Sequence, residues 1–330
     1  MPARATAVRP AWAIEGGRIS IEGTGFPVDA PQLPGIRIGG VRARPVFASA
    51  TEFAVLVPFG LDGGRASLAM DDVDTGDLTV GVAAAFATGL HQVDNPVFDA
   101  YGNLYVTYSG TRGQEVPVSI FRVRPNGTRE TFSSGIVNAT SMAIDPGGVL
   151  YVSSRFEGTV YRVHDDGTFE AFTTDLGVAC GLAFAPDGTL YVGDRTGTLF
   201  SVDRHGKASA FATIPASVAA FHLAMGPQGD IYVTAPTLSA HDSVYKVAQD
   251  GTVTAIEAGF GRPQGITFDA TGSALVVEAL AGASGLYRLR PSQPPELLLS
   301  GPGLVGVAVD PFGGMVVCSN ETAYRVRLEP

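Results

Sequence analysis

Apolar and polar positions alternate in short runs along the last three quarters of the chain, and these runs repeat. Each repeat has an apolar run, a turn containing glycine and a second apolar run. The six copies are NPVFDAYGNLYV from Asn95, SMAIDPGGVLYV from Ser141, GLAFAPDGTLYV from Gly181, HLAMGPQGDIYV from His222, GITFDATGSALV from Gly265 and GVAVDPFGGMVV from Gly306. Turns of the Pro-Asp-Gly type supply the fixed and positive backbone angles of a tight turn, so each copy predicts two strands joined by a short turn.

A second apolar pattern follows every copy, and a polar turn pair such as Asp166-Gly167 follows most of these second patterns. A short fourth strand is then expected, as in FEAFTT at Phe169–Thr174. Four antiparallel strands in about 41 residues are typical of one β-propeller blade. The β-branched and aromatic residues between turns disfavour a helical solenoid. The second patterns read IFRV, VYRV, LFSV, VYKV, LYRL and AYRV. We therefore expect an all-β chain with a six-bladed propeller over residues 81–330.

The last repeat lacks a fourth strand, because the sequence stops at Pro330 soon after AYRVRL. The segment GVAAAFATGL at Gly81–Leu90 resembles the fourth strands SAFATIP and EAFTTDL of other repeats. We predict that this N-terminal strand pairs with the last repeat and closes the ring. Closure leaves no exposed sheet edge, which is the usual site of aggregation.

Residues 1–80 do not fit the repeat. They contain short strand-like runs, RISIEG, GIRIGG, EFAVLVP, RASLAM and DLTVGV, between glycine turns, a pattern typical of a small β-sandwich. The strings IEGTGFP, RIGGVRA and VLVPFGLDGG resemble the immunoglobulin-like TIG domain. That resemblance implies a spacer or an interaction role for residues 1–80, joined to the propeller almost without a linker.

Composition narrows the classes of function. The formal net charge is −10, and no basic stripe stands out, which argues against nucleic-acid binding. Cys180 and Cys318 are too few for a disulfide framework, and no zinc-binding spacing occurs. An apolar run of about 18 residues, as a membrane span needs, is also absent. The first ten residues lack the apolar core of a signal peptide, so a cytoplasmic location is expected by default. A secreted form with its leader removed would look the same.

The candidate catalytic and ligand-binding residues lie on the strands that we expect to line the central channel. Three sets of aligned positions are expected to form rings near one mouth: the residue before each copy, its first residue, and the end of its second strand. The candidate catalytic residues from these rings are His222, Asp194, Glu278 and Asp94. The candidate ligand-binding residues are Asn95, Tyr108, Thr140, Ser154, Cys180, Phe221, Gln264 and Ser319.

His222 is the most specific candidate, because it occupies a position that is glycine in three copies. Imidazole is the usual general base near neutral pH, with Asp194 or Glu278 expected to orient it. A structural bond from the ring to a neighbouring blade's carbonyl is the alternative. Asp194 and Glu278 could instead bond backbone amides. We interpret Cys180 as a small buried residue of the apolar core, or alternatively as a nucleophile with His222 as its base.

The repeat GLAFAPDGTLYVGD at Gly181–Asp194 resembles NHL repeats and the gluconolactonase/regucalcin (senescence-marker) family. The resemblance spans residues 81–330 and implies a divalent metal held at the position before each blade motif. Asp94, in DNPVF, matches the first ligand of that family, while the other matching positions depart from it. A hard cation needs about six oxygen ligands. The cofactor is therefore unknown, and any Ca, Mg, Mn or Zn would be held weakly by Asp94 with Gln264 or Glu278 and waters.

Two classes of function follow. The first is a hydrolase acting on a lactone or ester at the channel mouth by acid/base chemistry. The second is a non-catalytic NHL-type binding propeller, with the TIG-like domain as a second contact surface. The expected partner is a small molecule in the first case and a protein in the second. A closed pocket with convergent polar groups favours the first class, and a flat face favours the second.

Overall fold

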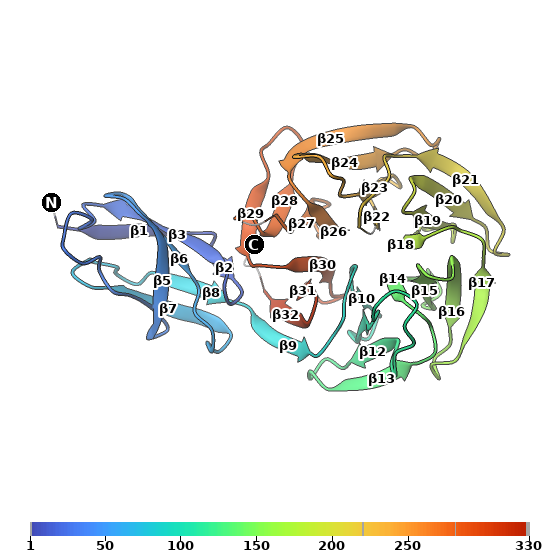
Figure 1. The fold of residues 1–330 in the computed structure, drawn as a ribbon, viewed down its shortest axis with the longest axis horizontal. Coiled ribbons are helices and arrows are strands. Elements are labelled where there is room, and N and C mark those ends of the chain that lie inside the picture. Colours follow the sequence, from blue (N-terminus) through green and yellow to red (C-terminus); the bar gives the residue numbers. More distant parts are fainter. Residues whose placement is uncertain (1, 220, 281, 328–330) are drawn as a thin grey trace.

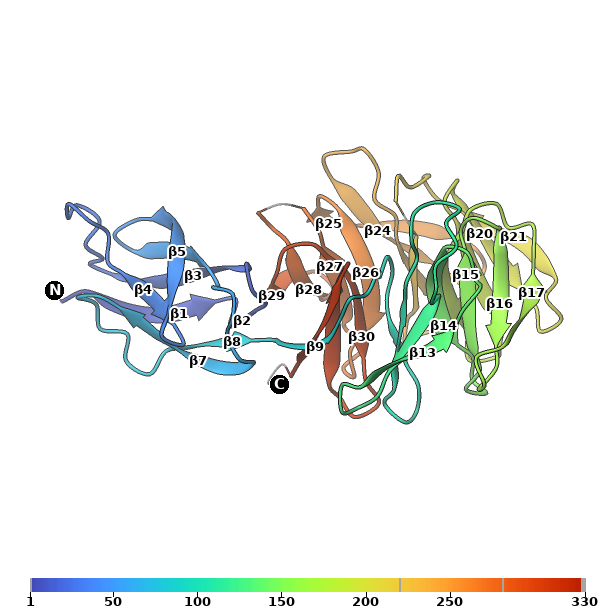
Figure 2. The same ribbon diagram turned by 60° about the horizontal axis from the view of Figure 1, so that its bottom comes forward.

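The computed structural model describes residues 2–219, 221–280 and 282–327. All regular elements in these ranges are β-strands, as the sequence predicts. None of these residues forms a helix that could cross a membrane. Figures 1 and 2 show two parts side by side, an N-terminal group of strands and a larger ring of sheets.

The N-terminal strands enclose a hydrophobic core of their own. Ile19 and Ile21 alternate with more exposed neighbours along one strand and lie opposite Val55 and Phe53 of the next strand, and all four are fully buried. Burial of one face of the first strand is what a period-two pattern predicts, whereas the second strand is buried continuously at its centre. The strands are β1 (Arg4–Arg9), β2 (Trp12–Ala13), β3 (Arg18–Thr24), β4 (Ile36–Ile38), β5 (Val41–Ala48), β6 (Glu52–Leu56), β7 (Gly64–Met70) and β8 (Thr79–Val82), joined in the order β1-β3-β6-β5-β4-β7-β8-β2.

The ring contains five separate four-stranded antiparallel sheets, which form a β-propeller (Figure 1). Their strands are β10 (Val97–Phe98), β11 (Leu104–Thr107), β12 (Ile120–Val123) and β13 (Arg129–Ser133); β14 (Ala139–Ile144), β15 (Leu150–Ser154), β16 (Thr159–Val163) and β17 (Phe169–Thr173); β18 (Ala179–Phe184), β19 (Leu190–Asp194), β20 (Thr198–Val202) and β21 (Ala208–Thr213); β22 (His222–Met225), β23 (Ile231–Thr234), β24 (Asp242–Val247) and β25 (Val253–Phe260); and β30 (Leu304–Val309), β31 (Met315–Ser319), β32 (Thr322–Val326) and β9 (Ala84–Thr88).

A further antiparallel run has the same strand order but is not a separate sheet. It comprises β26 (Pro263–Phe268), β27 (Ala274–Glu278), β28 (Gly285–Leu289) and β29 (Glu296–Ser300), and it continues through β2 into the N-terminal strands. Its first strand, β26, packs between β22 and β30. The strands β10, β14, β18, β22, β26 and β30 lie nearest the centre of the ring in Figure 1.

The first turn of each repeat is fixed by local hydrogen bonds. In the last repeat, Asp310 Oδ1 accepts from the backbone amides of Phe312 and Gly314, both at 2.8 Å. Gly313, between them, has φ of +84°, which a residue with a side chain rarely adopts. An aspartate that bonds the backbone two residues on is a common way to hold such a turn, so the Pro-Asp-Gly type of string specifies a strand boundary.

The predicted closing strand is present. β9 pairs antiparallel with β32, with Thr88 opposite Thr322 and Ala87 opposite Ala323. Both alanines are buried, and the guanidinium of Arg325 lies 3.7 Å from the ring centroid of Phe86. The last sheet therefore takes one strand from before the first repeat and three from the C-terminal end.

The sequence pattern did not reveal how the two parts join. Trp12 and Ala13 form a short strand that runs parallel to both β8 and β29. Ile14 follows, donates its amide to the carbonyl of Ser300 at 2.9 Å, and is 1% exposed. It packs among ring residues such as Leu299 and Leu304. The division after residue 80 stays a prediction, but Trp12 and Ile14 pack against ring residues while Ala13, between them, belongs to the N-terminal core.

Replacing Ile14 with alanine tests this joint. We expect Ile14→Ala to lower the free energy of unfolding by about 3 kcal/mol, because a buried side chain is lost from a packed cluster. Leu33→Ala, at a residue 44% exposed, serves as the control and is expected to change it by less than about 0.5 kcal/mol. Urea unfolding followed by the fluorescence of Trp12, the only tryptophan, measures both. Equal midpoints for the two variants would show that Ile14 does not anchor the joint.

Candidate functional site

The segment Asp94–Asn95 crosses the centre of the ring just before β10. The side-chain amide of Asn95 donates to the carbonyl of Ile266 at 2.8 Å, and its Oδ1 accepts from the amide of Val307 at 3.0 Å. These bonds connect the first repeat to β26 and β30. A Cβ on Gly265 would lie 2.2 Å from Asn95 Oδ1, and one on Gly306 would lie 2.5 Å from the carbonyl oxygen of Asp94. The two glycines are therefore required for this close approach.

A chain of three polar side chains runs from this segment. Asp94 Oδ1 forms a short hydrogen bond with His222 Nδ1, and His222 Nε2 lies 3.2 Å from Gln264 Oε1. His222 is 0% exposed, Asp94 1% and Gln264 7%. The three residues come from the loop before β10, from β22 and from β26. They meet at the centre because each lies at the start of an innermost strand.

This arrangement restricts the tautomer of His222. An ionised Asp94 accepts, so the proton of a neutral imidazole lies on Nδ1 and Nε2 is an acceptor. Gln264 must then turn its amide group toward Nε2, because only the hydrogen-bond network assigns its oxygen and nitrogen. When His222 carries both protons, Nε2 donates to Gln264 Oε1 instead. The orientation of the Gln264 amide therefore follows the protonation state of His222.

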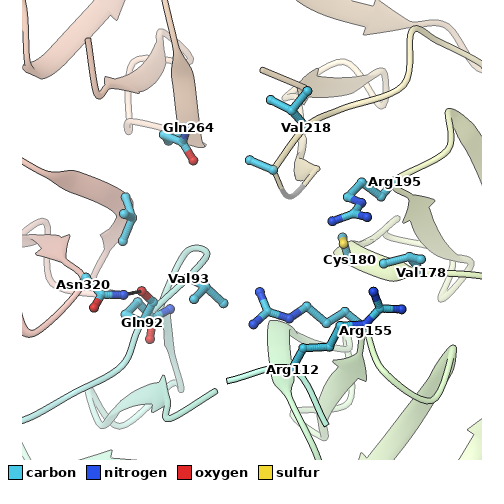
Figure 3. Close-up of a pocket in the computed structure, with 12 residues that line it drawn as sticks. Gln92, Val93, Arg112, Arg155, Val178, Cys180, Arg195, Val218, Gln264 and Asn320 are labelled. Carbon is cyan, nitrogen blue, oxygen red and sulfur yellow. Dashed lines mark hydrogen bonds between the residues drawn. The ribbon is translucent and has the colours of Figure 1, made fainter. Parts of the chain in front are cut away.

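A cavity of about 350 Å³ lies at one mouth of the channel. Gln264, which contacts His222, lines this cavity, whereas His222 is not among the lining residues. None of its lining residues is an aspartate or a glutamate. Figure 3 shows Gln92 and Asn320 on one side of the opening and arginine side chains on the other. The cavity is lined by Gln92, Val93, Arg112, Arg155, Val178, Cys180, Arg195, Val218, Ala219, Gln264, Val305 and Asn320.

Three arginines, Arg112, Arg155 and Arg195, give this mouth a positive charge. They lie in the loops that follow β11, β15 and β19. Burial lowers the pKa of Arg155, and the positive charges of Arg195 and Arg112 lower it further. Hydrogen bonds or ion pairs from these three guanidinium groups to other described residues are absent.

Cys180 lines the cavity but is not an activated thiol. It is 1% exposed, and burial raises its pKa to about 12. Only the thiolate is a good nucleophile, so the thiol is inert near neutral pH. Both nitrogens of His222 already contact Asp94 and Gln264. The alternative of a Cys180 nucleophile with His222 as its base is therefore not supported by the geometry.

Asp194 and Glu278 do not orient His222, so that expectation was wrong. Asp194 Oδ1 accepts from the amide of Val178 at 2.8 Å, and Glu278 accepts from the amides of Gly261 at 2.7 Å and Arg262 at 2.9 Å. Each carboxylate fixes the loop that leads into the innermost strand of its own sheet. The orienting carboxylate is Asp94, which belongs to a different ring of aligned positions.

The remaining predicted ligand-binding residues make internal contacts. Cys180 and Gln264 line the cavity, whereas Phe221 is buried in the core and Tyr108 lies beside the rings of His91 and Phe121. The hydroxyl groups of the others bond the backbone, as Thr140 does with Asn138 O at 2.8 Å, Ser154 with Val137 O at 2.6 Å and Ser319 with Thr322 O at 3.3 Å.

Sequence reasoning missed five polar residues of the cavity. Arg155, Arg195 and Asn320 each directly follow one of the aligned strand ends, so the next aligned position identifies them. Arg112 lies in a longer loop without a repeat. Gln92 bonds both the carbonyl of Asp94, at 2.6 Å, and the amide of Thr107, at 2.8 Å, and so holds the crossing segment in place.

The residues do not fit a divalent cation. Asp94 was the expected ligand, and its Oδ2 is buried without a partner among the described residues. Its Oδ1 contacts the imidazole of His222 and accepts from the backbone amide of Asn95 at 2.6 Å, whereas calcium takes six to eight oxygen ligands. Within the described ranges, no three histidine, cysteine or acidic side chains are grouped as a metal site would need.

Comparisons with known proteins address the fold. No family model and no curated protein sequence matches the chain. Among solved structures, a gluconolactonase from Xanthomonas campestris is 14% identical, with a TM-score of 0.62 over 76% of this chain and 90% of its own. This likeness shows that the chain has a β-propeller fold.

Two other solved structures cover almost the whole chain. An auxiliary nutrient binding protein from Bacteroides thetaiotaomicron is 13% identical, with a TM-score of 0.58 over 100% of this chain and 98% of its own. A catalytically inactive virginiamycin B lyase from Staphylococcus aureus, with quinupristin, is 13% identical, with a TM-score of 0.54 over 98% and 94%. At these identities the likeness shows the fold alone.

The buried pair leads to a stability prediction. We expect His222→Ala to lower the free energy of unfolding by about 3 kcal/mol, because it leaves the carboxylate of Asp94 buried without its partner. Asp94→Asn is expected to cost about 1 kcal/mol, since an amide oxygen still accepts from Nδ1. His205→Ala, at an exposed residue on an outer hairpin, is the control. Denaturant unfolding measures all three, and a cost for His222→Ala no larger than for His205→Ala would contradict the assignment.

Proposed function

We propose that the propeller binds a small molecule at the channel mouth and hydrolyses a lactone or ester there by acid/base chemistry. The observation that carries this proposal is the chain Asp94–His222–Gln264, which connects a buried carboxylate–imidazole pair to the cavity. A cavity with a few convergent polar groups is the usual form of a small-molecule site. It is unlike the flat face that a protein partner would favour.

The chemistry assigns one role to each group. Gln264 moves aside, and His222 Nε2 accepts a proton from a water that attacks the acyl carbon, while Asp94 stabilises the imidazolium. The arginines donate hydrogen bonds to the oxyanion that forms on the carbonyl oxygen. The acyl–oxygen bond then breaks, the imidazolium returns its proton to the alkoxide, and the carboxylic acid product releases its proton to solvent.

The comparisons add support without deciding the reaction. A neighbour in fold is described as a gluconolactonase and another as a nutrient binding protein, so small-molecule binding occurs on this fold. A second candidate function is binding without turnover. It is favoured by the complete burial of His222 and by the lack of a carboxylate among the lining residues of the cavity.

We also propose the finer architecture. Counting β26–β29 with the five separate sheets gives six blades, since this run has the blade order and lies between β22 and β30. We propose residues 1–80 as a TIG-like immunoglobulin domain, supported by its own hydrophobic core and by the strings that resemble such domains. Because β2 bonds to β29, this domain holds the edge of one blade.

A hydrolysis screen tests the function. Lactones and esters are assayed at neutral pH by acid release, with and without a chelator. We expect turnover that the chelator does not change, and a loss of at least about 100-fold in kcat for His222→Gln, as for removal of a general base. His205→Gln is the control, and melting temperatures verify folding. Turnover that His222→Gln leaves within about twofold would remove the histidine from the mechanism, and no turnover on any compound would favour binding alone.

A further inference from the structure

Three positively charged side chains converge on the cavity without a counter-ion. Arg112, Arg155 and Arg195 lie in the loops after the second strands of three successive sheets, and Figure 3 shows them around one part of the opening. Arginines elsewhere on the chain commonly pair with carboxylates, as Arg122 does with Glu130 and Arg288 with Asp269. For the cavity arginines, the described residues provide no such partner, and none of the lining residues is acidic.

This arrangement has an energetic cost in the protein alone. Arg155 is partly buried, and the charges of Arg112 and Arg195 act on it with the same sign. Removing a guanidinium group from water and placing it near like charges is unfavourable unless an anion compensates. The chain as a whole carries a net charge of −10, so the positive mouth is a local feature rather than a general property of the surface.

The chemistry of guanidinium groups indicates what would compensate. Their planar, forked donors match the paired oxygens of carboxylate and phosphate groups. The oxyanion of an ester hydrolysis carries only one charge and exists briefly, so three arginines exceed what that step needs. A cavity of about 350 Å³ leaves room for a small molecule with a second polar group.

Resting on the proposed function, we propose that the substrate carries a permanently anionic carboxylate or phosphate group in addition to its lactone or ester. Arg155 and Arg195 hold this group at the cavity wall, and Arg112, from the neighbouring loop, is left to donate to the oxyanion. Gln264, in β26 across the opening, then faces the acyl group.

Calorimetric titration of the full chain tests this without requiring turnover. The probes are inorganic phosphate, malonate and acetate at low ionic strength. We expect phosphate or malonate to bind more tightly than acetate, and Arg155→Gln and Arg195→Gln each to weaken that binding by at least about tenfold. Arg204→Gln is the matched control, because it removes the same charge from an exposed outer hairpin and should change affinity by less than about twofold.

Either probe as the tighter ligand supports the proposal and identifies the anionic group. The proposal is overturned when neither binds better than about 10 mM, or when the cavity variants bind as well as Arg204→Gln. Without a probe, Arg155→Gln should melt no lower than the unmodified chain, because it removes repulsion. Because Arg195 is exposed, Arg195→Gln repeats the binding test with a variant whose folding the substitution should not affect.

Kinetics separate this inference from the proposed function. A lactone with a carboxylate substituent should have a higher kcat/KM than its neutral analogue, and Arg155→Gln should remove most of that difference. Hydrolysis of both lactones with equal kcat/KM would retain the hydrolase and reject the anionic group. Binding of phosphate or malonate without hydrolysis of any lactone or ester would retain the anion site and reject the hydrolase.

Discussion

The contact between Asp94 and His222 across the channel determines how the rest of the site is arranged. Asp94 lies on the segment between β9, which completes the last sheet, and β10, which begins the next. The ring is therefore closed twice, by strand pairing at its outer edge and by side-chain bonds at its centre. Gly265 and Gly306 make the inner closure sterically feasible, and Gln92 holds the segment from the other side. A change at any of these positions would move the carboxylate that orients the imidazole.

The strands could be predicted from the sequence because all six repeats share one pattern of apolar runs and turns. Turn residues, alternation and spacing agree from copy to copy, so an error in one is corrected by the others. The closing strand could be found for the same reason, since Gly81–Leu90 resembles other fourth strands. The bond between β2 and β29 could not be found. Trp12 and Ala13 are too short a run to show a period, and their partner is nearly 290 residues away.

The sequence predicted several residues of the candidate site, but it did not predict which of them form hydrogen bonds with one another. Asp94, His222 and Gln264 were all identified, because polar groups on apolar inner strands are unexpected. Which carboxylate meets the imidazole depends on the direction in which each side chain leaves its strand. Asp194 and Glu278 turn toward backbone amides of their own sheets, and alignment of positions carries no information on that direction. Arg155 and Arg195 were missed because they lie one position past the aligned strand ends, and Arg112 because its longer loop has no repeat.

An acidic chain can still attract an anion to its channel mouth, because charges act over short distances in salt. At physiological ionic strength the Debye length is about 8 Å, so a ligand near the cavity responds mainly to charges at the mouth. There the nearest groups are three guanidiniums, while the carboxylate of Asp94 lies buried beneath Gln264 and His222. Asp194 and Glu278 are also buried and bond backbone amides, whereas most other carboxylates lie at the surface, where salt screens them from the cavity. The same separation keeps Asp94 paired with His222 rather than with an arginine, which leaves the arginines available to a ligand.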